Sequence, residues 1–145
     1  MAKNLILING PNLNLLGSRE PEIYGHSTLS KIENDLTKYS KSFGCELYCF
    51  QSNHEGEIIE SIHKAKENKV DAIIINPAGL SHTSIALRDA LVGVQIPFVE
   101  IHISNIFQRE NFRQFSYLSA VASGVITGLG EEGYKYAVEF CIKKL

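Results

Sequence analysis

Glu100 and His102 are the residues whose types and spacing most directly suggest catalysis. They lie two apart at the end of the run Pro97 to His102, which reads as a β-strand, so both side chains leave the same face. A carboxylate beside an imidazole can hold the tautomer of the ring and favour its protonated form. The pair therefore suits a general acid, which delivers a proton to a leaving group.

Tyr24 is a candidate base in the long loop of residues 9–25, which follows the first predicted strand. Holding a phenol ionised at neutral pH, about three units below its ordinary pKa near 10, requires roughly 4 kcal/mol of preferential stabilisation of the phenolate. Two guanidiniums in a water-excluded site can supply this, whereas one surface arginine does not. Arg19 lies in the same loop, and Arg113 is expected to approach from the other side. The alternative is a loop tyrosine that serves packing alone.

Further polar side chains follow the other predicted strands. Asn76 ends a strand and leads into a turn that contains His82 and several hydroxyl groups. These groups suit a polyhydroxylated ligand; alternatively, Ser81 or Thr83 only caps the next helix. Three of the four arginines lie in or just after such loops, and the planar fork of arginine suits carboxylate or phosphate recognition. The sequence therefore predicts a site for a small anionic ligand.

The elements that must position these residues alternate along the chain. Strands are expected at 4–9, 45–51, 70–76, 97–102 and 120–127, and helices at 28–43, 55–68, 83–92 and 131–145, with a short helix at 109–115. This alternation predicts an α/β fold: one domain, residues 1–145, with a doubly wound, flavodoxin-like, five-stranded parallel sheet. In such sheets the ligand binds beyond the carboxyl ends of the strands, where the polar residues collect.

Composition excludes several classes of protein. The chain is 44% apolar and 21% charged, and its net charge of −2 with no basic block argues against nucleic acid as a partner. No apolar run approaches the roughly 20 residues that span a bilayer, so no membrane association is expected. Cys45, Cys49 and Cys141 form no CxxC pair, which indicates reduced thiols rather than a disulfide framework or a metal site. A cytoplasmic protein is expected.

The segment Gly128 to Gly133 matches the dinucleotide pattern GxGxxG, but its context argues against that reading. Glu131 and Glu132 would repel a pyrophosphate at the start of the following helix, so the glycines read as turn and packing residues. Two alternative functions are a flavin- or nucleotide-binding module and a phosphotransfer receiver domain. The first requires a hydroxyl-rich loop after the first strand, whereas the loop here is rich in asparagine and leucine. The second requires acidic residues at the positions that Asn9 and Asn76 occupy.

Six motifs together resemble the type II 3-dehydroquinate dehydratases. They are NGPNLNLLGSREPEIYG at 9–25, QSNHEGE at 51–57, NPAGLSHTSIALRDA at 76–90, EIHISN at 100–105, RENFR at 109–113 and SGVITGLGEEGY at 123–134. The resemblance covers essentially the whole chain. It implies dehydration of 3-dehydroquinate to 3-dehydroshikimate in the shikimate or quinate pathway, by anti elimination through an enolate, with no cofactor or metal.

The resemblance also implies a role for each motif residue. Tyr24 would remove the proton beside the ketone as a phenolate favoured by Arg19 and Arg113. His102, oriented by Glu100, would protonate the departing hydroxyl. Further residues would place a water at the enolate oxygen (Asn12), hold ring hydroxyls (Asn76, His82, Arg113) and bind the substrate carboxylate (the amides of Ile103 and Ser104, with the Ser104 hydroxyl).

Two larger-scale features follow from the same resemblance. The loop at 9–25 would close as a lid over the substrate, with hinges near Gly17, Pro21 and Gly25. The chain would assemble as a homo-oligomer, a dodecamer built from trimers, in which Asp89 reaches the site of a neighbouring subunit. Periodicity and composition say nothing about that assembly.

Overall fold

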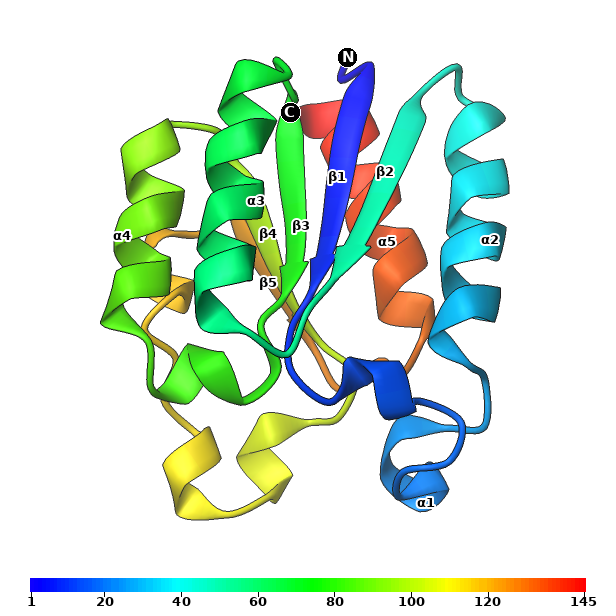
Figure 1. Ribbon diagram of the computed structural model, residues 1–145. Helices are drawn as coiled ribbons and strands as arrows, with labels where there is room; N and C mark the ends of the chain where they lie inside the picture. The colour runs from blue at the N-terminus through cyan, green and yellow to red at the C-terminus, as the bar shows by residue number, and fades with distance from the viewer.

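A five-stranded, all-parallel sheet forms the centre of the computed structural model, which describes residues 1–145 (Figure 1). The strands lie in the order β2-β1-β3-β4-β5. Their bounds are β1 Asn4–Asn9, β2 Glu46–Gln51, β3 Ala72–Asn76, β4 Phe98–His102 and β5 Gly124–Thr127. The predicted flavodoxin-like α/β architecture is confirmed.

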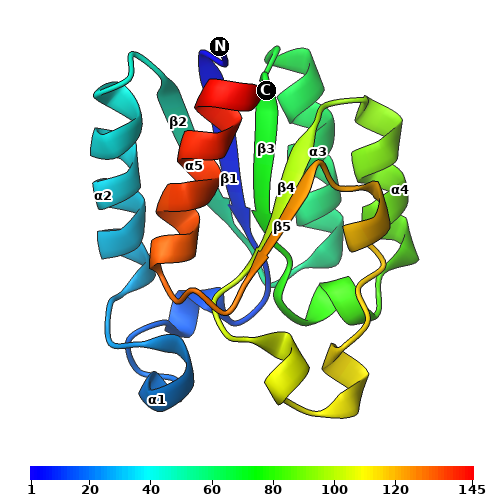
Figure 2. The same ribbon diagram turned by 180° about the vertical axis from the view of Figure 1, so that it is seen from behind.

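Four helices cover the two faces of the sheet. Helices α2 (Leu29–Lys41) and α5 (Glu132–Lys144) pack on one face, and α3 (Glu55–Glu67) and α4 (Ile85–Val94) on the other (Figure 2). Strand β3 shows why both layers form. Its alternate residues Ala72 and Ile74 pack in the α2/α5 cluster, whereas Ile73 and Ile75 pack in the α3/α4 cluster. None of the helices combines the length and the apolar character that crossing a membrane demands.

Helix caps account for two of the helix starts. The Thr28 hydroxyl accepts from the backbone N–H of Lys31 at 3.2 Å and opens α2. Helix α4 is capped by Ser84, whose hydroxyl accepts from the N–H of Leu87 at 2.9 Å. The expectation that Ser81 or Thr83 caps this helix is therefore wrong, because the preceding turn, Ala78–His82, is itself a 3-10 helix.

Three segments differ from the sequence prediction. The short helix expected at 109–115 is replaced by two 3-10 turns, Ile106–Gln108 and Asn111–Arg113, because Arg109 and Glu110 between them are extended. Strand β5 begins at Gly124 rather than at 120, since residues 119–121 form a 3-10 turn. The loop of residues 9–25 contains an unpredicted helical turn, α1 (Pro21–Tyr24), which proline opens at its first position.

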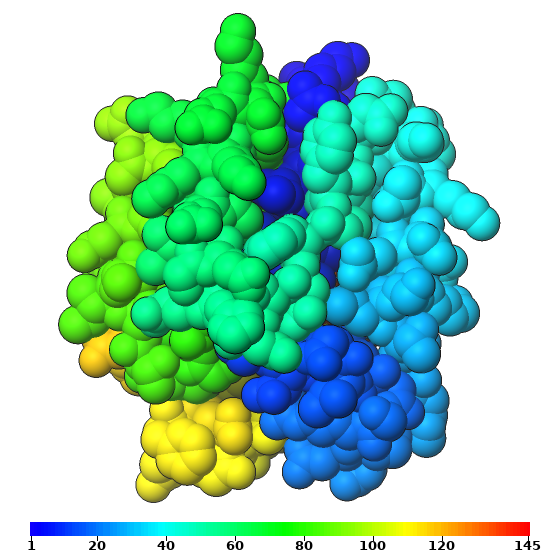
Figure 3. All heavy atoms as spheres, in the orientation of Figure 1, coloured from blue at the N-terminus to red at the C-terminus, as the bar shows by residue number.

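The loops that follow β1 and β4 gather at one edge of the sheet. All five strands point their carboxyl ends toward that edge, and both chain termini lie at the opposite end of the molecule (Figure 1). In the space-filling view, the first loop and the segment around residues 105–115 lie side by side at the lower edge (Figure 3). The chemistry-bearing loops therefore converge at the place where parallel sheets bind ligands.

Candidate active site

A cavity of about 210 Å³ lies beyond the carboxyl ends of β1, β3 and β4. Nine of the eleven predicted site residues line it: Asn12, Arg19, Tyr24, Asn76, His82, His102, Ile103, Ser104 and Arg113. A larger groove of about 710 Å³ is bordered by β1, β2 and α3, and contains none of them. We take the smaller cavity as the site because polar groups from the loops that follow β1, β3 and β4 converge there.

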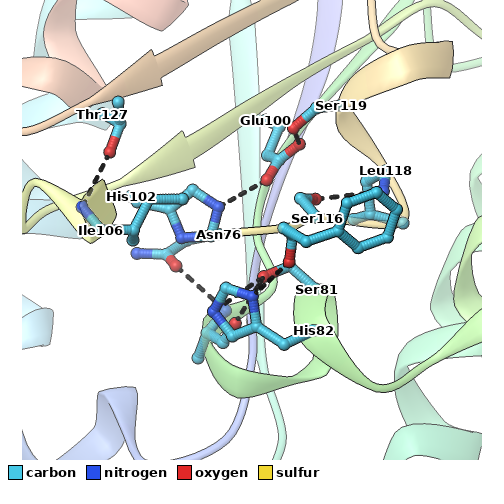
Figure 4. Close-up of polar contacts among 12 residues, drawn as sticks. Asn76, Ser81, His82, Glu100, His102, Ile106, Ser116, Leu118, Ser119 and Thr127 are labelled. Carbon is cyan, nitrogen blue, oxygen red and sulfur yellow. Dashed lines mark hydrogen bonds and ion pairs between the residues drawn. The ribbon is translucent and has the colours of Figure 1, made fainter. Parts of the chain in front are cut away.

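The predicted pairing of His102 with Glu100 is present at the end of β4. Nε2 of His102 lies 2.5 Å from Oε2 of Glu100, and the hydroxyl of Ser119 donates to Oε1 at 2.6 Å (Figure 4). Glu100 is fully buried behind the cavity wall, and His102 is 5% exposed. Burial opposes ionisation of Glu100, but the hydrogen bonds from His102 and Ser119 outweigh it and hold the pKa of the carboxyl below its usual value. The ring can therefore face the cavity in one fixed orientation.

His82 faces the same cavity from the turn after β3. Its Nδ1 donates to the backbone carbonyl of Phe115 at 2.7 Å, and its ring stacks near that of His102, with centroids 6.2 Å apart. Burial lowers the pKa of His82; the nearby His102 and Arg113 lower it further, whereas the bond to Phe115 opposes the shift. The neutral ring that results can donate and accept hydrogen bonds.

Tyr24 is held between two guanidiniums, but one of them is not the predicted arginine. Nη1 of Arg109 donates to the Tyr24 hydroxyl at 2.6 Å, and its Cζ lies 5.2 Å from the ring centroid. Arg19 lies over the ring, with its Cζ 4.7 Å from the centroid. Arg113 lines the cavity but is paired with Glu110, so the expectation that it approaches Tyr24 is corrected.

The extended backbone at residues 109–110 explains why Arg109, rather than Arg113, contacts Tyr24. Glu20 lies 4.0 Å from the Nη2 atom of Arg109, and the Ser104 hydroxyl accepts from its Nη1 at 3.4 Å. These contacts draw Arg109 across the cavity toward the first loop. Arg113 begins instead from the second 3-10 turn and is paired with Glu110, and it makes no hydrogen bond to the Tyr24 hydroxyl.

Backbone groups at the ends of β1 and β4 complete the cavity. The N–H groups of Ile103 and Ser104 donate to no acceptor within the chain, so both are free to bind an anion. Asn12 has φ of +72°, a left-handed conformation that asparagine tolerates, and its own N–H donates to Asn53 Oδ1 at 2.9 Å. This conformation turns the first loop sharply over the cavity.

Asp89 is the predicted site residue that lies apart from the cavity. It is exposed on α4 and borders a shallow surface depression together with His63 and Gly93. Its predicted role requires a second subunit, and within one chain it contacts none of the other site residues. No group of three or more His, Cys, Asp or Glu side chains is arranged to hold a metal ion.

Sequence reasoning missed three polar residues of this region. Arg109 was visible as one of the arginines after β4, but spacing alone could not choose between it and Arg113. Ser119 donates to Glu100 from a 3-10 turn whose residues 120 and 121 were read as strand. The hydroxyl of Tyr134 donates to Asn9 and accepts from Asn76, whereas the helical pattern identified only a buried ring.

Comparison with known proteins identifies relatives along the full chain. The family described as dehydroquinase class II matches residues 3–142. A 3-dehydroquinate dehydratase from Janthinobacterium sp. (strain Marseille) is 61% identical, with 100% of both chains covered. A catabolic 3-dehydroquinase 1 from Fusarium vanettenii is 58% identical over the same full extent.

Solved structures agree with this assignment. The crystal structure of a type II dehydroquinase from Propionibacterium acnes superposes with a TM-score of 0.94 at 40% identity, covering 99% of each chain. That of the type II dehydroquinase from Butyrivibrio crossotus also gives 0.94, at 45% identity and 97% coverage of each chain. The resemblance read from the sequence motifs is confirmed, and this chain belongs to the class II dehydroquinase family of enzymes.

Proposed function

We propose that this chain dehydrates 3-dehydroquinate to 3-dehydroshikimate in the shikimate or quinate pathway, by anti elimination through an enolate. The observation that carries the proposal is the Tyr24 hydroxyl, held by Arg109 at 2.6 Å with Arg19 over its ring, in the same cavity as the buried His102–Glu100 pair. A base and an acid with opposite electrostatic surroundings suit the removal of a proton and a hydroxyl from one substrate.

Tyr24 is the proposed base. The proton beside a ketone is weakly acidic, so its removal needs a strong base and a donor for the enolate oxygen. Arg109 and Arg19 place two positive charges against the phenol, which favours the phenolate. Asn12, at the cavity rim, is proposed to hold the water that stabilises the enolate.

His102 is the proposed acid. Glu100 occupies Nε2 of the ring, so Nδ1 is left to carry a proton toward the cavity. A fully buried carboxylate beside the ring stabilises the imidazolium that must form before the hydroxyl departs. Ser119 is proposed to keep that carboxylate ionised and oriented.

The remaining residues are proposed to bind the substrate. The free N–H groups of Ile103 and Ser104, with the Ser104 hydroxyl, suit a carboxylate, and Asn76, His82 and Arg113 suit ring hydroxyls. We also propose that the first loop moves as a lid about Gly17 and Gly25, whose φ values are +95° and +88°.

The test of this function is ultraviolet absorbance during incubation of the purified chain with 3-dehydroquinate. The product contains a conjugated enone, which absorbs where the substrate does not. We expect absorbance to rise with the parent chain and to stay at the no-enzyme rate with Tyr24→Phe. Absence of turnover by well-folded, assembled parent protein would overturn the proposal.

A further inference from the structure

A glycine in the first turn of α5, Gly133, brings the next residue, a tyrosine, into the core. A Cβ atom added at Gly133 would lie 3.2 Å from side-chain carbons of both Ile101 and Ile126, so the missing side chain lets α5 approach the sheet closely. The next residue, Tyr134, enters the core with its ring fully buried. Its hydroxyl thereby reaches the carboxyl ends of the two central strands.

The Tyr134 hydroxyl joins two asparagine amides. It lies 2.6 Å from Oδ1 of Asn9 and 2.9 Å from Nδ2 of Asn76. These asparagines are the last residues of β1 and β3 and lie opposite one another in the sheet register. Asn9 and Tyr134 are fully buried and Asn76 is 3% exposed, so solvent competes little for these bonds.

The single proton of the phenol gives this network a direction. Oδ1 of Asn9 can only accept, so the Tyr134 hydroxyl donates its proton there and must accept from Nδ2 of Asn76. Oδ1 of Asn76 meanwhile accepts from the backbone N–H of Ala78 at 3.2 Å. Both ends of the Asn76 amide are thus assigned, and a flip would place an N–H group against the N–H of Ala78.

We propose that Tyr134 is a positioning residue for ligand binding, whose buried hydroxyl fixes the Asn76 amide so that its second N–H faces the cavity. Asn76 lines the cavity, and Tyr134 does not. The group opposite Asn76 is therefore an acceptor, such as a hydroxyl or carboxylate oxygen. That this group belongs to 3-dehydroquinate rests on the function proposed above.

The test is a double-mutant cycle of Tyr134→Phe and Asn76→Ala, with KM and kcat for 3-dehydroquinate as readouts. Losing one oriented hydrogen bond predicts that Tyr134→Phe raises KM about five- to tenfold and changes kcat less than about threefold. In the Asn76→Ala background, Tyr134→Phe raises KM no further. Tyr39→Phe is the matched control: its hydroxyl donates to Glu139 at 2.8 Å between α2 and α5, and its KM stays at the parent value.

Two results would overturn the inference. One is a pair of KM effects that multiply in the double variant; the other is a fall in kcat with KM unchanged. A crystal structure of Tyr134→Phe provides a second readout, in which the Asn76 amide is rotated or in two orientations if the inference holds and unmoved if it fails. This readout needs no turnover. A parent chain that is inactive on 3-dehydroquinate would therefore refute the proposed function, while the orientation of the Asn76 amide would still test the inference.

Discussion

Arg109 is the residue whose position in the site most changes the chemistry expected from the sequence. It supplies the only hydrogen bond that the Tyr24 hydroxyl receives within the chain. We predict that Arg109→Gln lowers kcat at pH 7 by about 10- to 100-fold, the range for losing one charge aimed at a reacting group. Steady-state kinetics with 3-dehydroquinate at pH 7 measure this effect.

The matched control for this prediction is Arg88→Gln. Arg88 also uses its guanidinium in a hydrogen bond, donating from Nη1 to the Tyr117 carbonyl at 2.9 Å, but it does not line the cavity. Its kcat should stay within about twofold of the parent, since it acts on stability alone. An equal loss in the two variants would refute a specific role for Arg109.

The buried Glu100 carboxyl predicts a pH dependence of stability. Burial opposes its charge, yet the bonds from His102 and Ser119 leave its pKa lowered in the folded chain. A lowered folded pKa stabilises the fold above the unfolded value, near 4.3, and this contribution disappears as pH falls through the folded pKa. We predict that Glu100→Gln lowers the unfolding free energy by about 1–3 kcal/mol at pH 7, and that the gap narrows at acidic pH.

Urea unfolding at pH 7 and pH 3.5, at one protein concentration, measures this gap. Glu110→Gln provides the control, because the carboxyl of Glu110 is exposed beside Arg113 and its removal should leave stability nearly unchanged at both pH values. A gap that is as large at pH 3.5 as at pH 7 would contradict the assignment of an ionised Glu100.

The sequence allowed the His102–Glu100 pair to be predicted because both residues belong to one strand, where a spacing of two fixes a shared face. The partner of Tyr24 could not be predicted in the same way. The choice between Arg109 and Arg113 depends on the extended backbone at residues 109–110, which separates two 3-10 turns. No periodic pattern marks such a break, so only the folded chain distinguishes the two arginines.

At the scale of elements, the close approach of the β1 and β3 ends is the feature that builds the cavity floor. The N–H of Gly10 donates to the carbonyl of Asn76 at 2.8 Å, and a Cβ at Gly10 would lie 2.6 Å from the Pro77 carbonyl oxygen. Because that neighbour is backbone, the turn must shift. Gly10→Ala should therefore lower the unfolding free energy by about 1–3 kcal/mol and raise KM.

Gly56→Ala is the matched comparison for Gly10→Ala. Gly56 lies in α3, and nothing lies within 4 Å of an added Cβ there. Alanine in a helix should raise the unfolding free energy by roughly 0.5–1 kcal/mol. The two substitutions thus have opposite signs, and chemical denaturation of both variants shows whether the clash at Gly10 is real.

The bounds of the elements were predictable where periodicity is strong. Strand β1 matches its prediction at both ends, and β3 and β4 match at their carboxyl ends, which carry the site. Strand β5 was predicted too long because apolar residues 120–122 continue its pattern. There the Ser119 hydroxyl bonds to Glu100 and the chain turns before it enters the sheet, a tertiary contact that local pattern does not encode.

At the scale of the whole molecule, Asp89 is the residue that tests the proposed assembly. It is exposed on α4 and separate from the cavity of its own chain, so we propose that its effect on catalysis passes between subunits. We predict that the parent sediments as a dodecamer of 16.1-kDa chains, about 190 kDa. Asp89→Ala should lower kcat/KM while the assembly stays intact.

Mixing separates this role from a structural one. Assemblies formed from Asp89→Ala and Tyr24→Phe chains should regain part of the parent activity, because some cavities then combine an intact Tyr24 with an intact neighbouring Asp89. An active monomer, or no regain of activity in the mixture, would contradict the cross-subunit role.

The topology of one chain could be predicted from its alternating strands and helices, whereas the pattern of its surface residues carried no comparable signal of assembly.

The most direct test of the account is hydrogen exchange of 3-dehydroquinate in deuterium oxide, followed by proton NMR. If Tyr24 forms an enolate before His102 acts, His102→Ala should exchange a proton beside the ketone faster than it forms product, and Tyr24→Phe should exchange only at the no-enzyme rate. Exchange by Tyr24→Phe at the rate of His102→Ala, or none above background by His102→Ala, would contradict the assignment of base, acid and enolate.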